Sequence, residues 1–190
     1  MGYHGCERAL GLAVLFGRTR LRPSENDYDW LGGGTYFWEH GSRRALEWAQ
    51  ENRSEPFVIG AYLHLGRCFD LTDTWATARL DESYRTLQAV LTSTGVPMPR
   101  NSAGRGARAG DRLVRKLDCA VINLLNASED RRKGGTYYQT VRGVFEEGDV
   151  AFPGACVRAK THIQIAVRDP RCILGYFLPA DMVGGVRIAG

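Results

Sequence analysis

The chain has 190 residues, of which 44% are hydrophobic and 24% are charged, and its formal net charge is +4. This length and composition predict one globular domain over residues 1–190, because the chain can bury a core but is too short for two comfortable domains. The mildly basic net charge is compatible with nucleic-acid binding, but the chain lacks the strong lysine and arginine bias of a dedicated nucleic-acid binder.

The five cysteines are scattered and form no CxxC pair. This pattern predicts neither a disulfide framework nor a metal site, and reduced thiols fit the cytoplasm best. No apolar run approaches the length that a membrane-spanning helix needs, and the first residues lack a basic and apolar signal. We therefore expect a soluble cytoplasmic protein with no membrane partner.

The first half of the chain predicts short strands and helices separated by turns. Apolar spacing over residues 9–16 indicates a helix that ends at Gly17, and Thr35–Trp38 is typical of a strand. The period then changes, and Ser42 is expected to be the N-cap of the next helix. Further expected elements are extended segments at Phe57–Leu65 and Arg67–Leu71 and a helix at Thr74–Thr92.

The second half begins with Gly95–Gly110, a stretch rich in glycine, proline and arginine that predicts a surface loop. Arg112–Leu125 has the spacing of an amphipathic helix. The remaining expected elements are strands at Thr136–Phe145, Ala155–Lys160, Thr161–Arg168 and Cys172–Leu178. Early strands, helices between, and a late group of strands predict an α+β fold and not a doubly wound parallel sheet.

The most distinctive stretch is Leu31–Phe37 (Leu-Gly-Gly-Gly-Thr-Tyr-Phe), in which three glycines run into an aromatic strand. These glycines lead into a strand and not from a strand into a helix, so they match neither a dinucleotide-binding nor a P-loop motif. Glycines let backbone amides approach a planar amide closely, and a flat aromatic ring can hold a cationic pyridinium. The alternative is an ordinary bulge followed by ordinary strand packing.

Two short islands of sequence carry a family resemblance. Tyr3-His4-Gly5-Cys6 is similar to a His-Gly-Ser/Thr opening, with cysteine in place of the hydroxyl residue, and Leu31–Phe37 is similar to Phe-Gly-x-Gly-Ile-Tyr-Phe. Together they resemble the ADP-ribosyltransferase superfamily, in the branch of diphtheria toxin and the poly(ADP-ribose) polymerases, whose motif letters are His, Tyr and Glu. The resemblance implies an ADP-ribosyltransferase-like split β-sheet core with flanking helices, and NAD as a substrate.

The resemblance also implies roles for individual residues. His4 would hydrogen-bond the adenosine ribose of NAD, the backbone of Gly5 would hold the nicotinamide carboxamide, and Tyr36 would stack on the nicotinamide ring. Further NAD contacts would come from Gly34, Ser42 and Trp48, the last as a substitute for the second stacking ring of the polymerases.

The third motif letter falls on Gln164, in the expected strand Thr161–Arg168. Alternation puts Gln164 on the face opposite Ile163, Ile165 and Val167, which are expected to face the core. A glutamine can accept hydrogen bonds from the ribose hydroxyls, but it can neither stabilise an oxocarbenium ion by charge nor take a proton. This departure from the family pattern favours transfer of a single ADP-ribose unit over chain elongation.

A nearby carboxylate could supply the missing charge on the acceptor side. Glu146, Glu147 and Asp149 lie in a turn upstream of Gln164, in the expected substrate-recognition loop. The alternative is that these residues form a solvated acidic turn.

These observations predict an NAD-dependent mono-ADP-ribosyltransferase with His4, Tyr36 and Gln164 as its catalytic residues. The acceptor would be a macromolecule, either nucleic acid, RNA included, or protein, and the enzyme would be a small toxin or effector with an antitoxin or immunity partner. Arginines in the stretch from Gly95 to Lys116 favour nucleic acid, although a solvated loop explains them as well. Two alternatives stay open: an NAD-dependent RNA 2′-phosphotransferase, whose family also opens with a His-Gly pair, and a non-catalytic module that binds NAD or nucleic acid.

Overall fold

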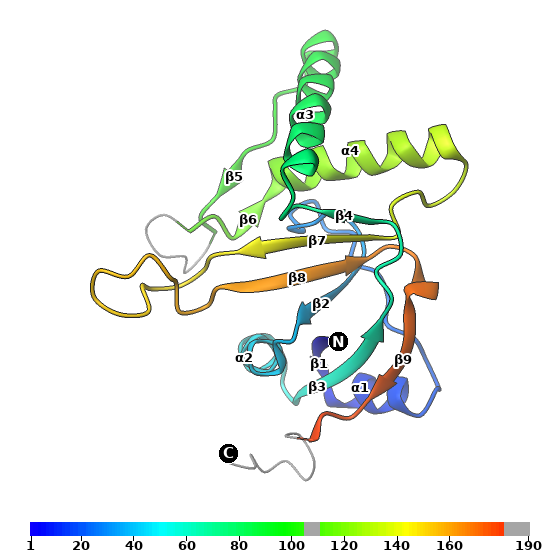
Figure 1. Cartoon of the computed structure of the whole chain (residues 1–190), viewed down its shortest axis with the longest axis vertical. Helices are drawn as coiled ribbons and strands as arrows, with labels where there is room; N and C mark the ends of the chain where they lie inside the picture. The colour runs from blue at the N-terminus through cyan, green and yellow to red at the C-terminus, as the bar shows by residue number, and fades with distance from the viewer. Residues whose placement is uncertain (105–110, 181–190) are drawn as a thin grey trace.

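The computed structural model describes residues 1–104 and 111–180, and its central feature is a curled seven-stranded sheet in the order β4-β7-β8-β2-β1-β3-β9 (Figure 1). Neighbouring strands are antiparallel except β4 and β7, which are parallel. The strands are β1 (Gly2–Glu7), β2 (Thr35–Glu39), β3 (Pro56–Leu63), β4 (Cys68–Asp70), β7 (Thr140–Phe145), β8 (His162–Val167) and β9 (Ile173–Phe177). A separate two-stranded ladder joins β5 (Asn101–Ser102) to β6 (Val114–Arg115).

Four α-helices flank the sheet in the described part of the chain: α1 (Arg8–Leu15), α2 (Ser42–Asn52), α3 (Thr74–Thr94) and α4 (Lys116–Lys133). A short 3-10 turn at Pro170–Cys172 precedes β9. The long helices α3 and α4 contact each other beyond the β4 end of the sheet, whereas α1 and α2 lie near β1 and β3 (Figure 1). Among the described residues no helix is long and apolar enough to cross a membrane.

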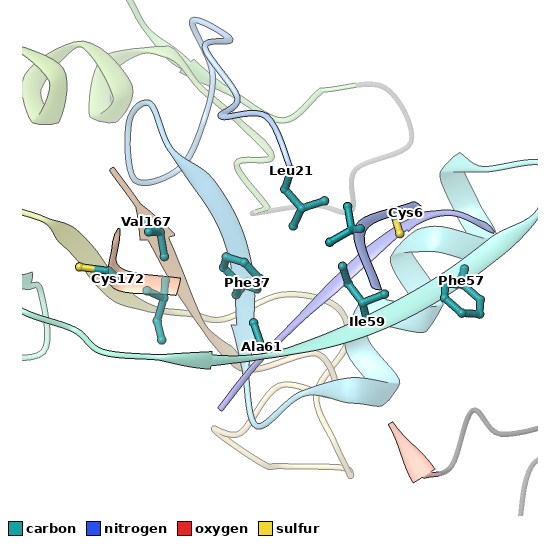
Figure 2. Packing of buried hydrophobic residues seen from close by; sticks show 10 residues of the cluster. Cys6, Leu21, Phe37, Phe57, Ile59, Ala61, Val167 and Cys172 are labelled. Atoms are coloured by element: carbon teal, nitrogen blue, oxygen red, sulfur yellow. The ribbon is translucent and has the colours of Figure 1, made fainter. Parts of the chain in front are cut away.

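Both faces of the sheet carry buried side chains, and successive strand residues contribute to opposite faces. One face carries Phe37, Ile59 and Val167, which pack with Cys6 and residues of α1 (Figure 2). The other face carries Val141 and Ala166, which pack in a second cluster with Phe69, Ile122 and Leu125. A smaller cluster of Trp38, Ala45 and Val58 joins α2 to the sheet.

The sequence predicted most of these elements. The α+β class is confirmed at the level of a mixed sheet with flanking helices, and the boundaries of α1, α3, β2, β3 and β8 differ from the expected ones by at most two residues. Local signals explain this success for α3: the Asp73 side chain accepts a hydrogen bond from the Trp75 amide, and Gly95 ends the helix with a φ of 70°.

Two predictions at the level of elements were wrong. The helix expected at Arg112–Leu125 covers Lys116–Lys133, because pairing with β5 keeps Val114 and Arg115 extended. The Asn101 side chain then accepts from the amides of Leu117 and Asp118 and so caps α4 from a distance. The strand expected at Ala155–Lys160 is instead a run of turns.

Smaller corrections concern Ser42 and the Gly95–Gly110 loop. Ser42 is the first residue of α2, and the N-cap position is held by Gly41, with no side-chain cap. The expected loop contains the short strand β5, and its residues 105–110 lie outside the described residues.

Candidate functional site

The strands β1 and β2 pair over only two positions, Gly2 with Glu39 and Tyr3 with Trp38. Beyond Tyr3 the two strands separate, while β1 stays paired with β3 up to Glu7. His4 is the first residue past the last pair, and its Nδ1 lies 2.8 Å from the carbonyl oxygen of Tyr36. A side chain therefore links the strands at the point where their backbone ladder ends.

This contact defines the tautomer of the neutral His4 ring. A carbonyl oxygen only accepts, so Nδ1 carries the hydrogen and the neutral ring keeps an acceptor at Nε2. Burial lowers the pKa of His4, with the nearby Arg53 acting in the same direction and the Tyr36 carbonyl opposing it. The neutral ring is therefore the favoured form at neutral pH.

Tyr36 holds the glycine run through its hydroxyl group. The hydroxyl donates to the carbonyl of Gly32 at 2.7 Å and accepts from the amide of Leu31 at 2.8 Å. Burial raises the pKa of Tyr36, so the group stays a protonated donor. The half-buried ring is thus fixed in place against the loop that precedes its own strand.

The glycine run is also tied to α4. The amide of Gly33 donates to Asn123 Oδ1 at 2.9 Å, and a Cβ on Gly32 would lie 2.5 Å from the same oxygen. Gly32 also has a φ of +74°, which a side chain would strain. Gly34 is less demanding, because a Cβ there would meet backbone and Cβ atoms of β8 at 3.1–3.2 Å.

Gly5 allows α2 to approach β1. A Cβ at this position would lie 2.3 Å from the carbonyl oxygen of Ala45 and 3.2 Å from the Trp48 ring. Trp48 in turn contacts the ring of Trp38 at a centroid distance of 5.8 Å, and the Arg53 guanidinium lies 4.7 Å from the Trp48 centroid. The expected NAD contacts Gly5, Ser42 and Trp48 therefore gather where α2 meets the sheet.

Cys6, the last residue of the opening motif, points into the core, with 1% of its surface exposed. Burial raises the pKa of its thiol to about 11, with Arg53 opposing and Glu7 adding to that shift. The side chain is thus a packing residue and not a nucleophile.

Gln164 lies opposite Trp38 in the pairing of β8 with β2, so the two side chains share a face of the sheet with Tyr36. Its amide nitrogen is 3.1 Å from His162 Nε2, and His162 Nδ1 is 2.6 Å from the Lys160 carbonyl. The predicted alternation is confirmed, because Ile165 and Val167 belong to one core cluster and Ala166 to the cluster on the opposite face. Both faces of β8 are covered at that end of the strand.

The three motif residues come from three adjacent strands, β8, β2 and β1, in a chain where they are up to 160 positions apart. They do not all point the same way. The His4 ring contacts the Phe37 ring at 5.8 Å and so lies on the face opposite Tyr36 and Gln164. What joins His4 to Tyr36 is the hydrogen bond to the backbone of β2.

A cationic and aromatic cluster that sequence reasoning missed lies beside Gln164. The Arg115 guanidinium is 4.3 Å from the Trp30 centroid and 4.8 Å from that of Phe145, and the Trp30 ring stacks on His162. Burial lowers the pKa of Arg115, with Asp118 and Glu147 opposing that shift. The four residues of the cluster come from four separate segments, and no local sequence spacing relates them to one another: Trp30, Arg115, Phe145 and His162.

The acidic turn after β7 is divided between two roles. Glu147 forms an ion pair with Arg44 of α2 at 2.9 Å, with side-chain exposures of 14% and 12%. Glu146 is exposed and lines a hollow of about 290 Å³, whereas Asp149 is exposed farther along the turn. The lining of the hollow consists of Asn101, Asp111, Arg112, Arg115, Asp118, Glu146 and Arg158.

Within residues 1–104 and 111–180, no group of three or more His, Cys, Asp and Glu side chains is arranged to hold a metal ion. In comparisons with protein-family models, with curated proteins and with solved structures, none matched this chain.

Proposed function

We propose that the protein is an NAD-dependent mono-ADP-ribosyltransferase with an ADP-ribosyltransferase-like split sheet. The observation that carries the proposal is the position of the three motif residues on adjacent strands, at the place where β1 and β2 separate: Tyr36 and Gln164 share one face, and His4, from the other face, contacts the Tyr36 carbonyl. This arrangement supports the His-Tyr-Gln reading of His4, Tyr36 and Gln164.

The NAD-binding role rests on groups whose positions are fixed by contacts within the protein. His4 is held with Nε2 as an acceptor, which suits a ribose hydroxyl, and the backbone of Gly5 lies past the end of the β1–β2 ladder. The hydroxyl of Tyr36 is engaged on both sides, so its ring can offer a fixed flat face to nicotinamide. Such preorganisation lowers the entropy that binding must overcome.

The reaction would be a single displacement at the nicotinamide ribose. The bond from C1 to the nicotinamide nitrogen breaks, and its electron pair neutralises the pyridinium. An acceptor oxygen or nitrogen bonds to C1, and its proton passes to solvent. Gln164 would accept a hydrogen bond from a ribose hydroxyl and so orient the sugar while positive charge develops.

The acceptor would approach from the side of the hollow and the acidic turn. Three arginines line the hollow, but so do three carboxylates, so the lining has no net formal charge. This balance does not select a polyanion over a protein acceptor, and it gives a bare 2′-phosphate no net positive charge to bind. We therefore rank mono-ADP-ribosylation of RNA, DNA or protein above 2′-phosphotransfer.

The direct test incubates the protein with NAD labelled in its adenylate and with separate pools of RNA, DNA and protein. The proposal expects label in one pool and equimolar release of nicotinamide. The Gln164→Ala variant should lose turnover and keep most NAD binding. Bound NAD without transfer to any pool would instead support the non-catalytic binding module.

A cellular test addresses the toxin reading. Expression of the wild-type chain should slow growth, and Tyr36→Ala should relieve the effect. The matched control is Tyr62→Ala, because Tyr62 is 54% exposed on β3 and its ring contacts Phe177 of the edge strand β9. Equal toxicity of all three proteins would speak against an effect of this site.

A further inference from the structure

His162 is held on several sides at the start of β8. Its ring stacks on Trp30 with a centroid distance of 5.9 Å and an interplanar angle of 25°. The Phe145 ring lies 6.0 Å away, on the residue that pairs with His162 across the β7–β8 ladder. The side chain is therefore fixed in position by packing before any polar contact is considered.

The polar contacts select one tautomer of His162. The Lys160 carbonyl can only accept, so Nδ1 at 2.6 Å must carry the hydrogen. The neutral ring then has a lone pair at Nε2, which lies 3.1 Å from the amide nitrogen of Gln164. The Gln164 amide is the donor in this contact, and its nitrogen branch is turned toward His162.

We propose that His162 is a positioning residue that orients the side-chain amide of Gln164. An amide carries its nitrogen and oxygen on two branches, so anchoring the nitrogen also fixes where the oxygen lies. The oxygen is the only side-chain atom of Gln164 that can accept from a ribose hydroxyl. The purpose of this orientation rests on the proposed function, whereas the orientation itself does not.

The arrangement depends on a neutral ring. A protonated His162 would donate from Nε2, so the Gln164 amide would have to turn over and present its nitrogen in place of its oxygen. The charged groups around the ring are Arg44 of α2, Arg115 of β6 and Glu147 of the acidic turn. Burial lowers the pKa of His162, the Lys160 carbonyl and the Glu147 carboxylate oppose this shift, and the two arginines reinforce it.

The kinetic test compares two substitutions of His162. Glutamine places an acceptor oxygen at a similar reach and does not titrate, whereas alanine removes the contact. We expect His162→Ala to lower kcat about tenfold and to change KM for NAD less than about threefold. In wild type we expect kcat to fall at acidic pH, as His162 becomes protonated. We expect kcat of His162→Gln to stay within about threefold of wild type at neutral pH and not to show this fall. The control is the exposed His64→Ala, which should match wild type.

A measurement without turnover tests the orientation directly. Nitrogen-15 NMR of the imidazole groups should show His162 in the neutral Nδ1–H tautomer at pH 7. Gln164→Ala should shift its Nε2 resonance, and folded spectra of each variant exclude misfolding as the cause. An Nε2–H tautomer, an unchanged resonance in Gln164→Ala, or wild-type kcat in His162→Ala would overturn the proposal. If wild type has no turnover, the proposed function fails, and the NMR result alone decides the orientation.

Discussion

Two regions of the sheet are held by different kinds of contact. The junction is the place next to Tyr3 where β1 and β2 separate, and the strand ends are the end of β7 at Phe145 and the start of β8 at His162. At the junction, glycines let backbones approach, and the polar contacts of His4 and Tyr36 go to backbone groups of neighbouring segments. At the strand ends, charged and aromatic side chains from distant segments hold one another, as Arg44 and Glu147 do. The junction is thus fixed by close packing, and the strand ends by paired charges and stacked rings.

This difference matters for what each region can tolerate. A hydrogen bond to a backbone group persists in any variant that keeps the chain path unchanged. It is lost when an added Cβ pushes the two segments apart. A buried ion pair fails when either partner is lost, because the other charge remains desolvated. The two regions should therefore respond to different classes of substitution, and this is open to measurement.

The largest effect is expected from Glu147→Gln, at the strand ends. The change leaves the Arg44 guanidinium buried, and within the described residues its remaining ion-pair partner is Glu47, at 3.9 Å. We expect a loss of about 3 kcal/mol in the free energy of unfolding, measured by urea denaturation. The control is Glu82→Gln, because Glu82 pairs with Arg79 at 2.7 Å but is 65% exposed. That pair should contribute less than about 1 kcal/mol, and similar losses in both variants would contradict this account.

Gly5→Ala probes the junction in the same assay. The added Cβ would meet the Ala45 carbonyl at 2.3 Å, so α2 or β1 has to shift. We expect a loss of about 2 kcal/mol. Gly33→Ala is the matched control, since a Cβ there meets only the Ser24 carbonyl at an ordinary 3.5 Å. Tolerance of both alanines would mean that α2 does not pack on β1 as closely as described.

The junction could be predicted from the sequence because its signals are local. The glycine run and the alternation of Thr35–Trp38 lie within a few residues of one another, and each indicates a backbone feature. The order of strands, and hence the meeting of His4 with Tyr36, was implied only by the family resemblance. Its placement in space came from the structure.

The strand ends could not be predicted because their contacts are remote in sequence. Trp30 and Arg115 are 85 positions apart, and nothing near either residue indicates the other. The same holds for the start of α4, where Asn101 supplies a cap from 16 positions upstream of Leu117. A prediction from helical periodicity alone therefore began that helix at Arg112 and missed the β5–β6 ladder.

Tyr36→Phe removes one hydroxyl from the junction and leaves the ring. The hydroxyl makes two hydrogen bonds to the glycine run, so the Gly32 carbonyl and the Leu31 amide would both lose a partner. We expect a loss of about 1.5 kcal/mol, measured by urea denaturation beside the control Tyr62→Phe on the exposed β3 residue. Faster amide exchange at Leu31 in Tyr36→Phe would locate the loss, and unchanged exchange there would argue that the hydroxyl does not hold the loop.

The smallest expected effect is the pH dependence that His4 gives to the junction. Burial, the largest cause, lowers the pKa of His4 in the folded protein below the value of 6.5 for a solvated histidine. Below pH 6.5 the unfolded chain therefore binds more protons than the folded one at this residue, and stability falls as the pH falls. Between pH 7.5 and 5.5 we expect His4 to account for a loss of about 1 kcal/mol.

Comparing wild type with His4→Gln isolates this contribution, because His162 is retained in both proteins and its pKa is lowered in the same direction. The difference between the two proteins in unfolding free energy should narrow or reverse as the pH drops, since only wild type carries the titrating group. A constant difference would mean that His4 titrates alike in the folded and unfolded chains. The side chain would then be too well solvated to bridge β1 and β2, and the contrast between a packed junction and charged strand ends would no longer hold.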